Sequence, residues 1–261
     1  PIDESPLFNP HEPFKNRDPR CAETIVEFQT EHLGFMFQPH PDSVTTYSFK
    51  SGTYVQNNDT RSVAQFTSYN GMVWKKGIDE DWSDDYNTDP DIILLRYADI
   101  LLMFAEAKIE LNEIDNSALS AINQVRARAY GVEESDVANY PEVVSAGQSD
   151  LRKIIRNERR MEFALEGLRY MDIIRWRLAE KVLNLPDVID LREKVVDQGL
   201  WFFPFTPEID EDGVADFKPM YDAGLVRILN QKAFDPKRQY LWPVPAKEFL
   251  INNKLGQNPF Y

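Results

Sequence analysis

The sequence has one cysteine, three histidines and no long hydrophobic run, and each shortage excludes a class of protein. With Cys21 alone, an intrachain disulfide is excluded. Cys21 follows a charged segment rather than an apolar one, so we expect a packed or free thiol and not a lipid attachment site. The longest apolar run, residues 100–105, has six residues, whereas about 20 are needed to cross a bilayer. No transmembrane helix is expected.

Histidines and catalytic motifs are equally scarce. His11, His32 and His40 all precede residue 41, and no two of them stand four residues apart, so no metal cluster is predicted. Neither a Gly-x-Ser-x-Gly nor a His-Glu-x-x-His motif is present, and Cys21 with a nearby histidine matches no known catalytic signature. We predict no catalytic residue, no metal and no cofactor.

Basic residues are outnumbered, with 29 Lys and Arg against 43 Asp and Glu, which gives a formal charge of −14. Nucleic acids and anionic membrane surfaces bind proteins through clustered Lys and Arg residues. Because acidic residues are in excess in this chain, neither is expected as a partner. The composition, 43% hydrophobic and 28% charged, is that of a globular protein with a hydrophobic core.

The chain divides into three regions that differ in composition and in expected secondary structure. Residues 1–91 are loop-rich and aromatic, with brief strands expected at Val44–Tyr47 and Gly71–Trp74. Residues 92–183 form the helical core, and residues 184–261 form an irregular carboxyl-terminal wrap rich in proline. The predicted fold is all-α, mainly helical and loop-rich.

Apolar residues at three- and four-residue spacing place the helices of the core. The first two form an antiparallel pair of tetratricopeptide length, although one pair is weak support for a repeat array. The expected helices run over residues 91–112, 116–129, 149–165, 169–183 and, near the end, 246–252.

The third and fourth of these helices carry the densest set of charges in the sequence. Such a set can be an anion site, a carboxylate acid–base pair, or an Arg–Glu lattice that ties helices together. We favour the lattice, and extend it to Arg96, Asp99, Glu106 and Arg126. The members on the two helices are Arg152, Arg156, Glu158, Arg159, Arg160, Glu162, Glu166, Arg169, Asp172 and Arg175.

Other acidic residues give weaker signals. With 43 acids, some pair always looks like the two carboxylates of a glycoside hydrolase, so no pair can be assigned from sequence. Glu208 to Gly213 begins like a calcium loop, but Pro219 stands where the motif requires a bidentate Glu. We expect a solvated acidic turn there.

Residues 44–86 contain eight aromatic side chains in a segment with little helical pattern. Exposed rings on such loops can stack on the C–H faces of a neutral sugar, although buried rings that hold the loops in place are the alternative. We predict that Trp74 and Trp82 stack on sugar, that Tyr69, Tyr54 and Tyr47 support or extend the platform, and that Asn57 and Asp84 accept hydroxyl hydrogen bonds.

Four blocks follow one another along the chain, with a shorter one upstream. The upstream block is FKNRDPR at 14–20; the four blocks are IILLRYADILLMFAEA at 92–107, ALSAINQVRARA at 118–129, ERRMEFALEGLRYMDIIRW at 158–176, and YLWPVP at 240–245 with QNPFY at 257–261. In this order the blocks resemble the SusD/RagB family of glycan-uptake proteins of Bacteroidetes. The departures are Asp99 where the family has Glu, Leu168 before Arg169, and Phe260 where Gly is common.

The resemblance implies a helical protein that holds oligosaccharide without catalysis at the outer-membrane surface and passes it to a SusC-like TonB-dependent transporter. It covers the carboxyl-terminal half of the family, so the lipid anchor and most helix pairs of the amino-terminal half are expected in a missing part. It also implies that the conserved blocks are scaffold and that variable loops bind the sugar. Two other functions stay open: a glycoside hydrolase, or a helical adaptor that binds protein or peptide.

Overall fold

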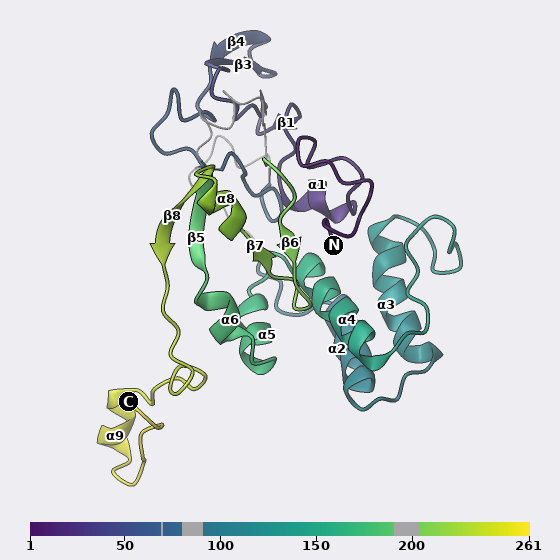
Figure 1. The fold of residues 1–261 in the computed structure, drawn as a ribbon, viewed down its shortest axis with the longest axis vertical. Coiled ribbons are helices and arrows are strands. Elements are labelled where there is room, and N and C mark those ends of the chain that lie inside the picture. Colours follow the sequence, from purple (N-terminus) through teal and green to yellow (C-terminus); the bar gives the residue numbers. More distant parts are fainter. Residues whose placement is uncertain (69, 80–90, 191–203) are drawn as a thin grey trace.

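The computed structural model describes residues 1–68, 70–79, 91–190 and 204–261 (Figure 1). Within these ranges, eight helices and eight strands are joined by long loops. The helices are α1 (Arg20–Thr24), α2 (Tyr97–Glu110), α3 (Asn116–Ala129), α4 (Gln148–Glu162), α5 (Arg169–Arg175), α6 (Ala179–Leu183), α8 (Lys218–Asp222) and α9 (Ala246–Ile251). The strands are β1 (Glu31–His32), β2 (Phe35–Met36), β3 (Thr45–Ser48), β4 (Thr53–Gln56), β5 (Pro186–Asp190), β6 (Glu208–Ile209), β7 (Ala215–Asp216) and β8 (Val226–Gln231).

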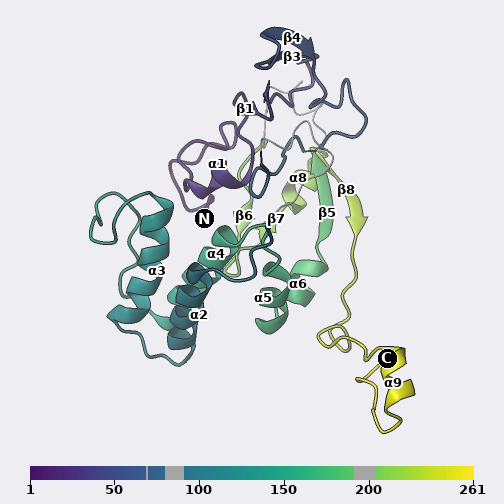
Figure 2. The same ribbon diagram turned by 180° about the vertical axis from the view of Figure 1, so that it is seen from behind.

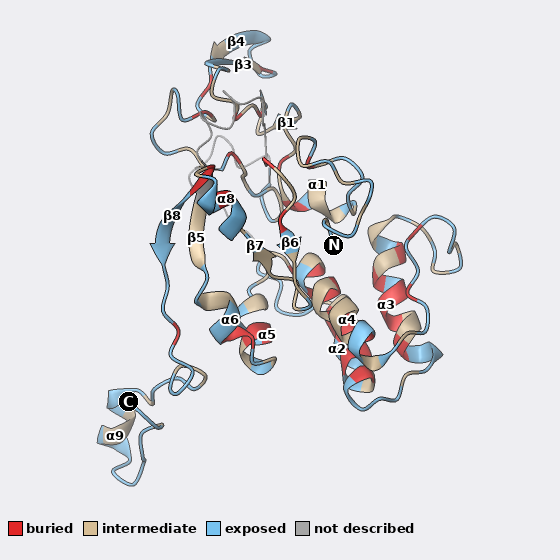
Figure 3. Cartoon of the chain, in the orientation of Figure 1, coloured by how far each residue is buried: buried red, intermediate tan, exposed pale blue. Residues whose placement is uncertain are grey.

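The main hydrophobic core lies between α2, α3 and α4. Leu102 and Ile109 of α2, Ile122 of α3, and Leu151 and Ile155 of α4 are fully buried there. Leu102 and Ile109 are seven positions apart in α2, and Leu151 and Ile155 are four positions apart in α4. Each pair therefore lies on one face of its helix. Figure 3 shows many buried residues along these three helices, so this bundle holds the main hydrophobic core.

The predicted helix 116–129 is confirmed at both ends. Asp115 caps α3, because its Oδ1 accepts hydrogen bonds from the backbone N–H groups of Ser117 at 3.0 Å and Ala118 at 3.2 Å. Gly131 follows the last turn with φ of 70°, a left-handed conformation that ends helices.

Two other predicted helices differ from the structure at their boundaries. The helix predicted from residue 91 begins at Tyr97, because Arg96 is extended (φ −127°, ψ 155°) and its guanidinium reaches Glu162 and Glu166. The helix predicted over 149–165 ends at Glu162, and Leu165 has a left-handed φ of 65°.

The helix predicted over 169–183 is wrong as a single element. Arg177 has φ of 57°, which separates α5 from α6. The break turns Leu178 and Ala179 inward against Ile173 and Phe234 in a second, smaller hydrophobic cluster. Tertiary packing therefore outweighs the helical periodicity of this stretch.

The strands contradict a strictly all-α fold. They form a four-stranded antiparallel sheet in the order β1-β2-β3-β4 and two separate antiparallel pairs, β5 with β8 and β6 with β7. β3 confirms the strand expected at Val44–Tyr47, whereas the expected strand at Gly71–Trp74 is reduced to a single bridge between Trp74 and Ile25. Local hairpin pairing, which needs no long apolar run, accounts for these small sheets.

The two ends of the chain lie in different surroundings. The N-terminal segment and α1 lie beside α4, whereas α9 lies at the end of an extended segment away from the helical bundle (Figures 1 and 2). The helix α9 confirms the one predicted over residues 246–252. Among the described residues, no helix has the length and apolar character needed to cross a membrane.

Candidate binding site

A cleft of about 700 Å³ opens between the N-terminal segment and α4. One wall consists of residues near α1, including Phe8, Arg17 and Cys21, and α4 forms the opposite wall. The loop at Trp74 and the turn between β6 and β7 also border the cleft. We refer to this space as the α4 cleft.

The sequence of α4 explains how one helix builds both the core and the cleft. Leu151 and Ile155 face the hydrophobic core. The residues that face the cleft repeat at three- and four-residue intervals and therefore lie on another face of the same helix. Within α4 they are Asp150, Lys153, Ile154, Arg156, Asn157, Arg160 and Met161, and Ala164 lines the cleft just after the helix ends.

Trp74 stands at the cleft with 54% of its surface exposed. Its backbone neighbours are fixed to the chain around α1: Val26 N–H donates to the Val73 carbonyl at 3.1 Å, and Lys75 N–H donates to the Thr24 carbonyl at 2.9 Å. Hydrogen bonds thus fix the backbone on both sides of the exposed Trp74 indole.

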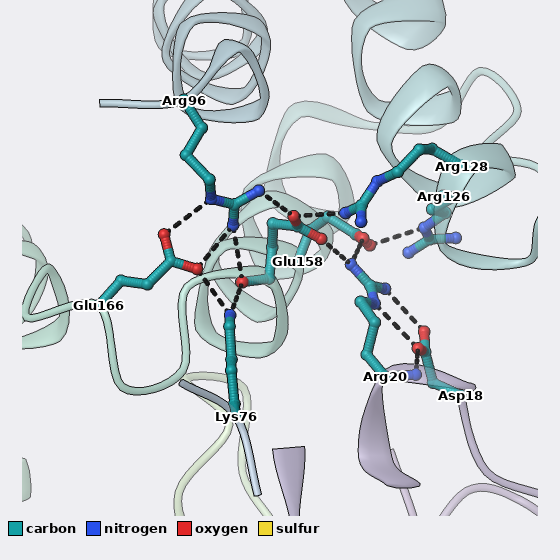
Figure 4. A network of polar contacts seen from close by, with 9 residues as sticks. Asp18, Arg20, Lys76, Arg96, Arg126, Arg128, Glu158 and Glu166 are labelled. Atoms are coloured by element: carbon teal, nitrogen blue, oxygen red, sulfur yellow. Dashed lines mark hydrogen bonds and ion pairs between the residues drawn. The ribbon is translucent and has the colours of Figure 1, made fainter. Parts of the chain in front are cut away.

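Behind the cleft, Glu158 is fully buried within a network of ion pairs (Figure 4). Arg20 Nη1 lies 2.7 Å from Glu158 Oε1, and Arg126 Nε donates to Glu158 Oε2 at 2.7 Å. Arg20 also contacts Asp18 at 2.7 Å. Burial by itself lowers the pKa of Arg20, but its bonds to Asp18 and the charge of Glu158 outweigh burial and raise that pKa.

The same network continues through Glu162 to Arg96 and Lys76 (Figure 4). Arg96 forks onto Glu166, with Nε to Oε2 at 2.7 Å and Nη2 to Oε1 at 2.8 Å. Burial raises the pKa of Glu162, but the hydrogen bond from Arg96 and the charge of Arg128 more than offset burial, and the pKa stays below its ordinary value.

A second group of ion pairs joins α2, α4 and α5. Arg159 lies between Asp99 at 2.8 Å and Asp172 at 3.0 Å. Arg175 and the indole N–H of Trp176 both donate to Glu106, at 2.6 Å from Arg175 Nη2 and 2.6 Å from Trp176 Nε1. The predicted Arg–Glu lattice is confirmed, and its carboxylates are neutralised inside the fold.

Two arginines that we expected in the lattice do not join it. Within the described ranges, neither Arg160 nor Arg169 contacts a carboxylate: Arg160 donates to the Gly213 carbonyl, and Arg169 lies 5.9 Å from the centre of the Trp176 ring. Both line the α4 cleft. Sequence reasoning did not predict that Arg160 and Arg169 line a cleft. The spacing of Lys153, Arg156 and Arg160 places these three basic residues on one helix face, which was the signal in the sequence.

The predicted sugar-binding residues are not brought together by the described structure. Trp74 lies at the α4 cleft, whereas Tyr47 and Tyr54 face each other across β3 and β4, with ring centroids 5.6 Å apart. Neither tyrosine lines the cleft, and Tyr54 is 72% exposed. Tyr69, Trp82 and Asp84 lie outside the described residues.

Asn57 is fully buried, which overturns its predicted contact with sugar hydroxyls. Its Nδ2 donates to the backbone carbonyls of Gln38 at 2.6 Å and Ser43 at 2.5 Å, and its Oδ1 accepts from the Asp59 N–H at 3.0 Å. The amide holds two loops together and has no exposed atom for a ligand.

In the described ranges, neither the acidic turn nor Cys21 belongs to a group of three residues that could hold a metal ion. The turn between β6 and β7 is bound by Lys181, whose Nζ lies 2.7 Å from Asp210 and 2.6 Å from Asp212, so it is ion-paired rather than simply solvated. Cys21 is a half-buried free thiol, and burial raises its pKa. The described part of the chain contains no group of three His, Cys, Asp or Glu residues that could hold a metal.

The sequence profile of the SusD family matches residues 4–261. The chain belongs to the SusD family. Its relatives include the SusD-like protein P2 of Formosa agariphila, 28% identical over 202 residues that cover 76% of this chain and 30% of P2. The SusD-like protein P38 of the same organism is 36% identical over 116 residues, which cover 44% of this chain and 22% of P38.

Solved SusD-like structures have the same fold as this chain. A SusD-like carbohydrate-binding protein of Bacteroides fragilis matches 97% of this chain and 44% of its own length, with a TM-score of 0.63 and 28% identity. A second SusD-like protein of that organism matches with a TM-score of 0.59 and 24% identity, over 100% of this chain and 42% of its own length. The SusD-like chain described here thus spans less than half the length of these relatives.

Proposed function

We propose that this SusD-like chain binds oligosaccharide without catalysis, and that the α4 cleft is its binding site. The observation that supports the proposal best is the exposed indole of Trp74 on a cleft of about 700 Å³. A related SusD-like structure from Bacteroides fragilis is named as a carbohydrate-binding protein, and we extend that property to this chain.

The chemistry of the cleft suits a sugar ring. An indole offers a flat apolar face to the C–H groups of a sugar, and such ring contacts contribute about 0.5–1.5 kcal/mol beyond the area that they bury. Asn157 and the arginines of α4 line the same cleft and supply donors to hydroxyl oxygens. Affinity would then come from several weak contacts.

The remaining aromatic residues form a wider proposed set. Tyr47 and Tyr54, on the β3–β4 hairpin, would contact a long glycan away from the cleft. Trp82, Tyr69 and Asp84 remain proposed from sequence. Asn57 is left out because it is buried.

For the whole protein, we propose a lipid-anchored position on the outer-membrane surface, where it delivers glycan to a SusC-like TonB-dependent transporter. Family membership over residues 4–261 is what supports this role. The transporter is the proposed protein partner.

Two alternatives receive less support. A glycoside hydrolase needs two accessible carboxylates that face each other. Of the four acidic residues that line the cleft, Glu4, Asp18 and Asp212 are held in ion pairs with Lys153, Arg20 and Arg156. A peptide-binding adaptor would use a mainly apolar groove, whereas Lys153, Arg156 and Arg160 place charged groups beside the apolar residues of the α4 wall.

Affinity electrophoresis against a panel of plant, host and microbial polysaccharides tests the proposal. We expect at least one glycan to retard the wild-type chain, and Trp74→Ala to abolish most of that retardation. Phe66→Ala is the matched control, because Phe66 is 95% exposed and does not line the cleft. The double variant of Trp74 and Trp82 extends the test to the wider set.

Two results would refute the proposal. Unchanged retardation of Trp74→Ala rejects the α4 cleft as the binding site. Release of reducing ends during prolonged incubation of the wild-type chain with the retarding glycan rejects the non-catalytic function.

A further inference from the structure

The helix α2 is apolar on two opposite faces. Leu102 and Ile109 are fully buried on its inner face, against α3 and α4. Apolar side chains on the opposite side of the helix, again at three- and four-residue spacing, are exposed. They are Tyr97, Ile100, Met103, Phe104, Ala107 and Leu111, the last just after the helix, and we refer to them as the outer face of α2.

Two charged side chains flank the outer face, and both already have partners. Lys108 lies 5.4 Å from the centre of the Phe104 ring but is bound to Asp115. Glu110 accepts a hydrogen bond from Arg152 Nε at 2.7 Å. The outer face itself contains no Asp, Glu, Lys or Arg. A charged ligand therefore meets no free counter-charge there, and the face suits an apolar partner.

Such a face is unusual on a surface helix. Surface helices present charged and polar side chains to water, and a helix that is apolar all round lies inside a larger protein. Tyr97 is 70% exposed, Phe104 45% and Leu111 68%. Residues 92–95, just before α2, are four further exposed apolar residues. Contiguous apolar surface of this kind marks an interaction site.

The lengths of the solved SusD-like relatives point to what covers this face. Two of them align with 97% and 100% of this chain, but over only 44% and 42% of their own lengths. More than half of each relative thus lies outside the shared region. A helix is a fitting cover for the 14 residues of α2, because side chains of one helix pack into the grooves of another along its length.

We propose that the outer face of α2 is the docking surface for an amphipathic helix from the remaining part of a longer SusD-like protein. In that protein α2 is an interior helix, with α3 and α4 on one side and the docked helix on the other. Phe104, near the middle of the face, is the main anchor, because an aromatic ring buries a large apolar area. A second copy of this chain is the alternative occupant.

Hydroxyl-radical footprinting tests the proposal by comparing this chain with the longer SusD-like polypeptide that contains it. At a matched radical dose, we expect Met103 and Phe104 to be oxidised in this chain and protected in the longer polypeptide. Equal oxidation of both residues in the two proteins overturns the proposal. The measurement uses wild-type proteins, so it does not depend on whether a variant folds.

The substitution Phe104→Gln tests the role of the anchor. In this chain the residue is exposed, so the melting temperature should stay close to that of the wild type. In the longer polypeptide the melting temperature should fall, because an amide without a hydrogen-bond partner is then buried. Phe66→Gln is the matched control, since Phe66 is 95% exposed and lies outside the outer face, and it should change neither protein.

The remaining outcomes separate the two occupants. Sedimentation analysis of the longer polypeptide shows whether it is a dimer. A dimer that dissociates in Phe104→Gln, with Met103 oxidised again on dissociation, assigns the outer face to a second copy and overturns the proposal. A monomer with Met103 protected supports the proposal. None of these readouts involves glycan, so this proposal and the proposed function fail separately.

Discussion

Arg20 on α1 and Glu158 on α4 form an ion pair of 2.7 Å between Nη1 and Oε1, and this pair joins the two walls of the α4 cleft. Glu158 is fully buried, and Arg126 holds its other oxygen. Arg20 is itself fixed by Asp18. The position of the N-terminal segment against the helical bundle thus depends on a buried carboxylate.

Removing the charge of Glu158 should destabilise the fold strongly. Glu158→Gln leaves Arg20 and Arg126 without their shared anion, and the loss of one partner from a buried ion pair costs about 3–5 kcal/mol of the free energy of unfolding. Urea denaturation measures this loss. Arg152→Gln, which breaks the solvent-exposed pair with Glu110, should cost less than about 1 kcal/mol, and equal losses in the two variants would contradict this account.

Stability should fall in mild acid because the lattice lowers carboxylate pKa values. The pKa values of Glu162 and Glu166 lie below their ordinary 4.5, since hydrogen bonds and charges from Arg96 and its neighbours outweigh the opposing effect of burial. Their contribution to the free energy of unfolding is present above pH 4.5 and is lost as pH falls through the lowered values.

Thermal melts between about pH 7 and about pH 3 measure this dependence. The melting temperature of the wild-type chain should drop below about pH 5, and Glu162→Gln should show a lower melting temperature at neutral pH with a shallower drop. A melting temperature that is constant down to about pH 3 would show that the lattice adds no pH-dependent stability.

The helical bundle should depend on close packing at Ile155. Ile155→Ala creates a cavity at a fully buried position and should cost about 2–5 kcal/mol. Ile251→Ala is the matched control, since Ile251 is 80% exposed on α9, and its cost should stay within about 0.5 kcal/mol. Chemical denaturation of both variants distinguishes core from surface, and comparable losses would place the core elsewhere.

Asn57 should act on stability and not directly on binding. Asn57→Ala leaves the carbonyls of Gln38 and Ser43 without their shared donor, at a cost of about 1–3 kcal/mol. Calorimetric melts report this loss, and glycan titration below the melting transition should give wild-type affinity. A selective loss of affinity without a change in melting would return Asn57 to the binding site.

The helices of the core were predictable because periodicity and end signals agree there. Asp115 and Gly131 mark the ends of α3 in the sequence and in the structure. The break at Arg177 was not predictable, since it depends on the packing of Leu178 and Ala179 against Phe234, far along the chain. The division into residues 1–91, 92–183 and 184–261 remains a prediction.

The binding site was less accessible to sequence reasoning. Aromatic composition identified Trp74 but could not tell that Asn57 turns inward, because burial depends on which loops meet. The charge pattern predicted the lattice through Glu158, yet only the fold shows that, among the described residues, Arg160 and Arg169 form no ion pair with its carboxylates. A pattern of charges on a helix shows which face is polar, and the fold decides which charges are neutralised.

The crystal structure of the chain with a retained oligosaccharide tests the central claim most directly. Our account predicts a sugar ring against the indole of Trp74 in the α4 cleft. Sugar bound on the β3–β4 hairpin or along α9, with the α4 cleft free of it, would contradict the account.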